Sequence, residues 1–297
     1  MTAPRMTTLA QALSDAERRF VAAGIDSARA DSRILMSHAT GLDRAQVLTR
    51  PDAPLSSRAL ARLACMTERR VAREPVALIT GLREFWSLPL KVTRATLVPR
   101  PDSETLIEAA LAALPDRTWP YRVLDLGTGS GCLLLALLSE LPNATGLGVD
   151  ASRAALRVAR TNARRFELAG RASFVAGDWG RALDARFDVI LSNPPYVRDA
   201  DWAVLDEDVR RYEPKAALLA GADGLDAYRA LAPDVLRLLA PGGLFVGEFG
   251  LGQSTLVQRV LADVGLAVRA IHCDLSGIPR CLLATSDGND GFAKLRI

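Results

Sequence analysis

The chain has 297 residues, of which 49% are hydrophobic and 24% are charged, with a net charge of +3. This composition is typical of a folded globular protein and excludes a disordered, collagen-like or heptad-dominated chain. No apolar stretch approaches the ~20 residues of a membrane span, the N-terminus lacks the apolar core of a secretory signal, and two histidines with four scattered cysteines argue against a metal site. We therefore expect a cytoplasmic protein without a metal or a membrane partner.

The first 75 residues have a helical pattern. Apolar residues recur at spacings of three and four in the first helix, at Leu9, Leu13, Ala16 and Phe20. A second helix ends near Gly41, and a third begins after the capping residue Ser56. Residues 1–75 hold twelve arginines and eight acidic residues. We predict a small, slightly basic helical domain over 1–75 that recognises the substrate.

The pattern changes between residues 76 and 98, where short apolar runs are broken by glycine, proline and threonine. This pattern of short, interrupted apolar runs predicts a strand pair that links two domains. The segment PRPDSE follows at 99–104, and its Asp102, Ser103 and Glu104 suit the cap and first turn of a helix over Thr105–Leu114. Capping is at least as good an interpretation of these three residues as a place in the active site.

Residues 99–297 alternate between strand and helix patterns after Tyr121. Seven strands are predicted, at 122–127, 145–150, 172–177, 187–192, 243–249, 266–272 and 281–285. Helices are predicted between them, at 131–140, 152–167, 225–239 and 254–264. Alternation of this kind predicts an α/β fold with a mostly parallel, doubly wound sheet. The last two strands have no helix between them, so one of them, taken as the last, should run antiparallel.

A glycine-rich turn follows the first strand of this sheet and opens a helix. Its residues are Gly127, Thr128, Gly129, Ser130 and Gly131. Glycines let the backbone approach a ligand closely, and a helix N-terminus favours anionic groups. The spacing GxGxG differs from the GxGxxG of nicotinamide-binding turns, which weighs against that cofactor.

Acidic and aromatic residues end the next two strands. Asp150 closes the second strand, where a carboxylate can accept hydrogen bonds from a ribose diol, although it could instead cap the helix beginning near Ser152. Asp178 and Trp179 follow the third strand. A ring and an acid at this place suit an adenine base, but the tryptophan could equally fill the core.

The fourth strand ends in Asn193, Pro194, Pro195 and Tyr196. The two prolines stiffen the loop. The asparagine side chain and the Pro194 carbonyl supply two acceptors for the hydrogens of a planar NH₂ group, and Tyr196 supplies a ring face. At this strand end, the loop is more plausibly a substrate site than a simple rigid turn.

The order DLGTGSG, Asp150, GDW and NPPY resembles class I S-adenosylmethionine-dependent methyltransferases that act on a planar nitrogen, and more narrowly the protein-(glutamine) methyltransferases that modify peptide chain release factors. The resemblance covers nearly the whole chain. It implies a Rossmann-like seven-stranded sheet and S-adenosylmethionine held by Gly127 to Gly131, Asp150, Asp178, Trp179 and Asn193. It also implies that residues 193–196 bind the glutamine of the GGQ motif, with Asn193, Pro194 and Tyr196 catalytic, and that a release factor is the partner. We expect the protein to be a monomer.

Three alternatives remain open on these motifs. NPPY also occurs in enzymes that methylate adenine amino groups in DNA or RNA and in enzymes for a ribosomal-protein glutamine. Base-modifying enzymes need aromatic and basic contacts to extract their target, whereas this chain is only 5% aromatic and near-neutral beyond residue 75, so we expect no direct nucleic-acid contact. A scaffold that only binds the cofactor would have no use for NPPY.

Overall fold

The computed structural model describes residues 7–286. Its internal contacts divide the chain into two compact units. The helical unit contains the chain up to Gly81 together with Asp206–Tyr212, and the sheet unit contains Leu82–Leu205 together with the chain from Glu213 onward. Each unit has a hydrophobic core of its own. Among residues 7–286, no helix is both long and apolar enough to cross a bilayer.

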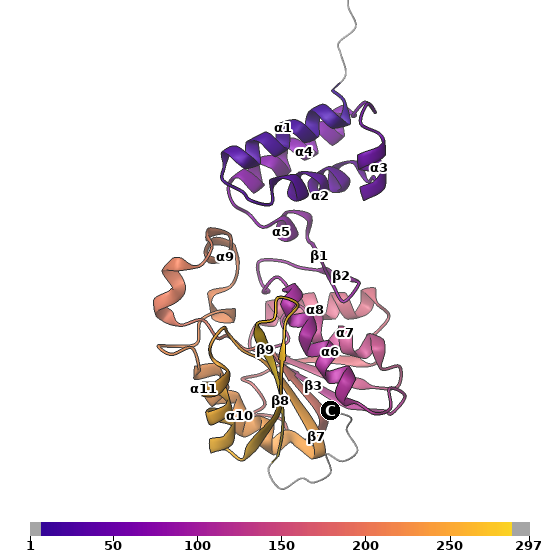
Figure 1. Ribbon diagram of the computed structural model, residues 1–297. Helices are drawn as coiled ribbons and strands as arrows, with labels where there is room; N and C mark the ends of the chain where they lie inside the picture. The colour runs from indigo at the N-terminus through magenta and orange to yellow at the C-terminus, as the bar shows by residue number, and fades with distance from the viewer. Residues whose placement is uncertain (1–6, 287–297) are drawn as a thin grey trace, which may run out of the picture. The chain divides into compact units, whose positions relative to one another are not determined.

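From residue 7 onward, the helical unit is built from six helices (Figure 1). They are α1 (Leu9–Ala22), α2 (Ala28–Thr40), α3 (Arg44–Thr49), α4 (Ser57–Val71), α5 (Val76–Thr80) and α9 (Glu207–Tyr212). The predicted helix ends are confirmed: Gly41 is left-handed with φ of 79°, and the Ser56 hydroxyl accepts a hydrogen bond from the Ala59 N–H at 3.2 Å. The apolar faces of α1, α2 and α4 meet in one core.

The strand prediction was wrong at Val76–Thr80, which forms α5. A short apolar run has no periodicity that separates strand from helix, and left-handed Gly81 ends the helix after five residues. The strand pair itself is confirmed just beyond, as the antiparallel hairpin of β1 (Leu82–Phe85) and β2 (Leu88–Lys91). Its two turn residues have positive φ, as a tight two-residue hairpin turn requires.

Helix α9 was not predicted, although it carries contacts that hold the helical unit together. The Arg70 guanidinium donates to Asp31 at 2.8 Å and to Asp208 of α9 at 2.7 Å. The Tyr212 hydroxyl donates to the Ala72 carbonyl at 2.7 Å. A segment that leaves the sheet unit after the fourth predicted strand is therefore part of the helical unit.

The seven predicted strands form one sheet in the order β5-β4-β3-β6-β7-β9-β8. Their bounds are β3 (Arg122–Leu126), β4 (Thr145–Asp150), β5 (Ala172–Ala176), β6 (Phe187–Ser192), β7 (Leu239–Glu248), β8 (Leu266–Cys273) and β9 (Pro279–Ser286). Strand β9, the last in the chain, is antiparallel to both its neighbours, and the pairs among β3 to β7 are parallel. The predicted fold class is confirmed.

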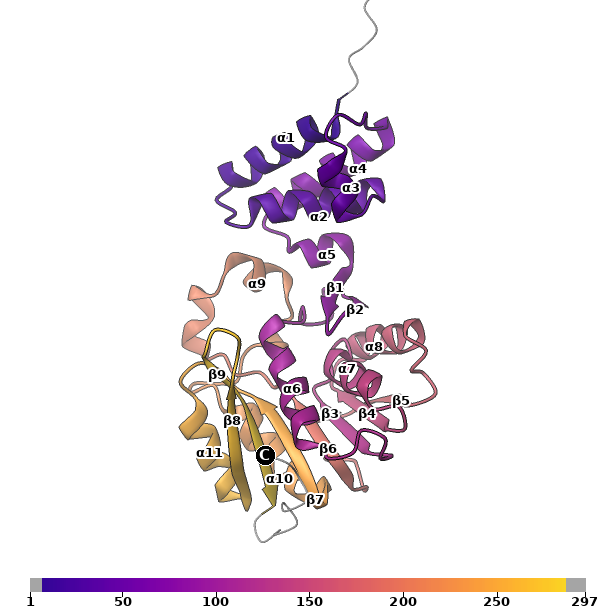
Figure 2. The same ribbon diagram turned by 45° about the vertical axis from the view of Figure 1, so that its right-hand side comes forward.

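Helices cover both faces of this sheet (Figures 1 and 2). One face packs on α6 (Glu104–Ala113), α7 (Cys132–Glu140) and α8 (Arg153–Arg165), and the other on α10 (Asp226–Leu238) and α11 (Ser254–Asp263). Three short 3₁₀ segments complete the unit, at Pro101–Ser103, Asp199–Val204 and Lys215–Ala217. Successive strands run outward from β3 to β5, and the chain then returns to place β6 on the other side of β3. Such a reversal leaves a crevice at the carboxyl ends of the strands, where ligands bind.

Candidate active site

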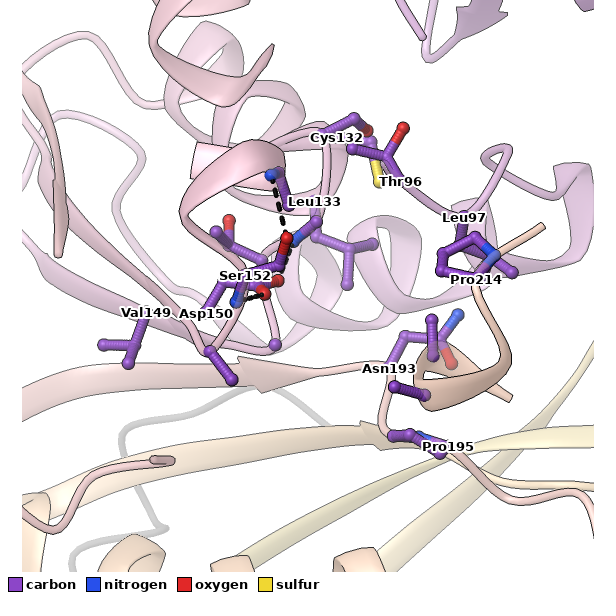
Figure 3. A pocket seen from close by; sticks show the side chains of 18 of the residues that line it. Thr96, Leu97, Cys132, Leu133, Val149, Asp150, Ser152, Asn193, Pro195 and Pro214 are labelled. Atoms are coloured by element: carbon purple, nitrogen blue, oxygen red, sulfur yellow. Dashed lines mark hydrogen bonds between the residues drawn. The ribbon is translucent and has the colours of Figure 1, made fainter. Parts of the chain in front are cut away.

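A cavity of about 370 Å³ opens at this crevice, a size within the range of small-molecule sites. Its walls come from the turn after β3, the ends of β4, β5 and β6, and the segments around residues 95–103 and 214–217 (Figure 3). All its lining residues belong to the sheet unit. The motifs predicted from the sequence are thus brought together in one place.

The glycine-rich turn between β3 and α7 forms the floor of this cavity. Gly127, Gly129 and Gly131 have φ of 77°, 56° and 81°, a region that other residues adopt at a cost. The N–H groups of Gly127 and Thr128 both donate to the Val149 carbonyl at 2.9 Å, which ties the turn to β4. Four of the five predicted turn residues line the cavity, and Gly131, the fifth, is not among its described lining residues.

Asp125, which precedes this turn, is buried and was not among the predicted binding residues. Burial raises the pKa of its carboxyl group to about 7. Its Oδ2 accepts a hydrogen bond from the Thr128 hydroxyl at 2.5 Å. Within residues 7–286, its Oδ1 and the Ser130 Oγ have no hydrogen-bond partner. Of these two residues, Ser130 lines the cavity and Asp125 is not among its described lining residues. A buried polar atom without a partner at a cavity, such as the Ser130 Oγ, is suited to a polar ligand.

Asp150 lies at the end of β4 with its carboxylate at the cavity wall (Figure 3). Its Oδ2 accepts the Gly129 N–H at 2.8 Å, and its Oδ1 accepts the Ser152 N–H at 2.7 Å. The cap of α8 is Ser152, whose hydroxyl accepts the Ala155 N–H. Asp150 is therefore not the helix cap. Because each carboxylate oxygen can accept more than one hydrogen bond, it remains able to accept from a diol.

Asp178 and Trp179 line the cavity beyond the end of β5. Trp179 is partly buried and packs against the apolar cluster under α10, so its ring has one side in the core and another at the cavity. The Asp178 side chain is 60% exposed and forms an ion pair with Arg181. The ring is thus more firmly held than the acid.

The NPPY loop contributes to the cavity unequally. Asn193 and Pro195 are among the lining residues, whereas Pro194 is buried and, like Tyr196, is not one of the lining residues in the described part of the chain. The Tyr196 hydroxyl donates to Oε1 of Glu248 at 3.3 Å. Burial and the nearby Glu248 raise the pKa of Tyr196. We expected the Tyr196 ring to face the ligand, but its hydroxyl lies against Glu248.

Two residues that the sequence did not assign to the site lie against Asn193. The Asn193 Nδ2 donates to Oε2 of Glu248 at 2.8 Å and to Oγ of Ser103 at 3.0 Å. Ser103 was interpreted as a possible helix cap, but its side chain makes no capping hydrogen bond to α6 and donates instead to Glu248. No local signal in the sequence joins these three residues.

The fit between cavity and cofactor is good. Left-handed glycines give close backbone approach, Asp150 offers acceptors for a ribose, and Trp179 offers a ring for a base. The Ser130 Oγ, which has no partner among residues 7–286, offers a further polar contact. Together with a seven-stranded sheet and an antiparallel β9, these features define a class I methyltransferase that uses S-adenosylmethionine as the methyl donor.

Comparison with known proteins places the chain more narrowly. Residues 11–81 match the family described as PrmC N-terminal domain, and residues 120–258 match the family described as Methyltransferase domain. A release factor glutamine methyltransferase of Rhodospirillum rubrum is 48% identical over 90% of this chain and 81% of that protein. Those of Bradyrhizobium diazoefficiens and Caulobacter vibrioides are 44% and 43% identical, over 92% and 94% of this chain and 95% and 97% of theirs. The chain belongs to the release factor glutamine methyltransferase family.

Solved structures with lower sequence identity support the fold. The hMettl16 catalytic domain in complex with an MAT2A 3'UTR hairpin has a TM-score of 0.57 at 18% identity, covering 75% of this chain and 83% of that chain. A methyltransferase from Pyrococcus furiosus has a TM-score of 0.50 at 16% identity, covering 74% and 98%. At these identities the likeness concerns the methyltransferase fold alone.

Proposed function

We propose that this enzyme transfers the methyl group of S-adenosylmethionine to the side-chain amide nitrogen of a glutamine in peptide chain release factors, the glutamine of the GGQ motif. The observation that carries the proposal is the position of Asn193. It lies at the end of β6, in the same cavity as the glycine turn and Asp150. The enzyme works in the cytoplasm as a monomer, with a release factor as its partner and without direct contact to nucleic acid.

The cofactor is held by the residues that line the inner part of the cavity. Residues 127–131 would approach it with their backbone, Asp150 would accept from the ribose hydroxyls, Trp179 would stack on the adenine, and Asp178 would accept from the adenine amino group. When bound, S-adenosylmethionine supplies an electrophilic methyl group on a positively charged sulfur. Asn193, which lines the same cavity, would hold the substrate amide against this methyl group.

The NPPY loop orients the substrate amide. The lone pair of an amide nitrogen is delocalised into its carbonyl, which makes the nitrogen a poor nucleophile. Asn193 Oδ1 and the Pro194 carbonyl accept the two amide hydrogens, orient the nitrogen toward the methyl group and increase its electron density. Holding the reacting atoms at about 3–3.5 Å from each other lowers the activation barrier by several kcal/mol. Pro195 and Tyr196 fix the loop that carries these acceptors.

The helical unit recognises the release factor beyond its glutamine. The support is that the cavity is lined only by residues of the sheet unit, while residues 1–75 carry the net positive charge. Arg44, Arg58 and Arg62 are exposed in this unit. Changing all three to glutamate should raise KM for the release factor several-fold, while Kd for the cofactor stays within twofold of wild type.

A methyl-transfer assay tests the proposed function. The enzyme is incubated with labelled S-adenosylmethionine and a purified release factor, and the modified residue is located by mass spectrometry. Label on the glutamine is the expected result, and a release factor with alanine at that position should remain unlabelled. Parallel reactions contain DNA, RNA or ribosomal protein. Label there instead of on the release factor would refute the proposal in favour of the corresponding alternative, and no transfer to any of them would indicate a cofactor-binding scaffold.

A further inference from the structure

The amide of Asn193 can perform its proposed role in only one of its two orientations. Its Oδ1 must face the substrate, because a side chain that presented Nδ2 would place a donor against the donor hydrogens of the substrate amide. Rotation by about 180° around the last side-chain bond exchanges the two atoms with almost no change of shape. The contacts behind Asn193 must therefore distinguish oxygen from nitrogen.

Glu248 and Ser103 provide such contacts. Both donors of Asn193 Nδ2 are used, one by Oε2 of Glu248 at 2.8 Å and one by Oγ of Ser103 at 3.0 Å. The Ser103 hydroxyl hydrogen is itself donated to Oε2 of Glu248 at 2.5 Å. The hydroxyl oxygen is thus left as an acceptor toward Asn193. A flipped Asn193 would turn its oxygen toward the Glu248 carboxylate, acceptor against acceptor.

Glu248 is itself fixed in place. It is the last residue of β7, and the residue is only 2% exposed. Its Oε1 accepts from the Tyr196 hydroxyl, and its backbone carbonyl accepts from the Tyr228 hydroxyl at 2.5 Å. Because Ser192 pairs with Gly247 in the parallel β6–β7 ladder, Asn193 and Glu248 leave the sheet side by side. Glu248 is not among the described residues that line the cavity, so it acts through Asn193.

We propose that Glu248, assisted by Ser103, is a positioning residue that takes up both N–H groups of Asn193 and thereby presents its Oδ1 to the substrate amide. The inference rests on the proposed function, since it assigns a role to the atom that receives the glutamine NH₂. It explains why a carboxylate is retained in the core at the end of β7, where burial raises its pKa. The Asn193 side-chain amide is therefore held in one of its two orientations before the substrate binds.

The test is a double-mutant cycle between Glu248→Gln and Asn193→Ala, with single-turnover methyl transfer to a release factor as the readout. Glutamine has the shape of glutamate but can offer either oxygen or NH₂ to Asn193, so both orientations become available. We expect the rate to fall about 10-fold in the single variant. In the Asn193→Ala background the same change should alter the rate less than twofold, because residues that act as one unit are not additive.

Three controls separate positioning from loss of structure. Asp188→Asn removes a carboxylate that accepts the Arg122 N–H at 2.7 Å at the amino-terminal ends of β3 and β6, opposite the cavity, and it should leave the rate unchanged. Ser103→Ala should slow transfer, whereas Ser103→Thr keeps the hydroxyl and should restore it. The cofactor Kd of Glu248→Gln should stay within twofold of wild type, which shows that the cavity remains folded.

A second measurement does not depend on activity. In wild type, the side-chain N–H protons of Asn193 should exchange slowly with solvent in NMR spectra, and they should exchange faster in Glu248→Gln. Additive rate effects, or equal exchange in the two proteins, would overturn the inference. If the wild-type enzyme does not methylate release factors at all, the proposed function fails, whereas the exchange comparison still decides whether Glu248 orients Asn193.

Discussion

Asp150 is the residue whose replacement should most directly weaken cofactor binding. Its carboxylate accepts N–H groups from Gly129 and Ser152 at 2.8 and 2.7 Å and lies at the cavity wall. Asp150→Ala removes the proposed acceptors for the ribose and also the carboxylate that accepts the Gly129 N–H of the glycine turn. A hydrogen bond to a charged group contributes about 1.5–3 kcal/mol. The Kd for S-adenosylmethionine should therefore rise about 10- to 150-fold.

Isothermal titration calorimetry with S-adenosylmethionine measures this change directly. Asp150→Asn should lie between the alanine variant and wild type, because it keeps one acceptor oxygen and turns an NH₂ group toward a backbone N–H. Asp188→Ala is the matched control: it also removes a carboxylate that accepts a backbone N–H, but at the amino-terminal ends of β3 and β6, away from the cavity. An Asp150→Ala enzyme that binds as tightly as wild type would refute the assignment of this carboxylate to the ribose.

Three further predictions concern catalysis and stability. Asn193→Ala should lower kcat ~10²-fold, because lost alignment adds to the ~1 kcal/mol of a lost hydrogen bond; steady-state kinetics with an unchanged kcat would reduce NPPY to a rigid turn. Burial raises the pKa of Glu248 to about 7, so the stability that its protonated form contributes is complete below pH ~4 and lost as pH rises through 7. The Tm of Glu248→Gln, measured relative to that of wild type, should accordingly increase between pH 5.5 and 8. A Tm difference that does not change with pH would contradict this prediction. Arg70→Leu leaves Asp31 and Asp208 without their buried cation. The free energy of unfolding, measured by denaturant titration, should fall by about 3 kcal/mol. A decrease below about 1 kcal/mol would show that water replaces the guanidinium group.

The strands and most helices could be predicted from the sequence because their signals are local. An apolar run such as 187–192 determines the structure of its own segment. The capping residues Gly41 and Ser56 each set the end of the helix next to them. The prediction failed where the local signal is ambiguous, at Val76–Thr80, a run too short to show a period. It also missed α9, which has few apolar residues and is held in the helical unit by the ion pair between Asp208 and the buried Arg70.

Part of the site was also accessible from the sequence. The glycine turn, Asp150 and Asn193 each follow a strand, and the carboxyl ends of parallel strands converge on one edge of a sheet. This rule brings them to one cavity without knowledge of any distance, and the structure places all of them there. Tyr196 was assigned a ring contact by the same rule, but the direction of its side chain depends on Glu248, which the rule does not include.

The sequence by itself thus determined the seven strands, the order of the motifs and the edge of the sheet at which they meet. Only the tertiary structure decided that β6 lies beside β7 with Ser192 opposite Gly247, which brings Glu248 to Asn193 across 55 residues of chain. The same holds for Ser103, which is 90 residues away from Asn193. Contacts over such separations are set by strand order, register and packing, because these depend on the whole chain and leave no pattern in any short stretch of it.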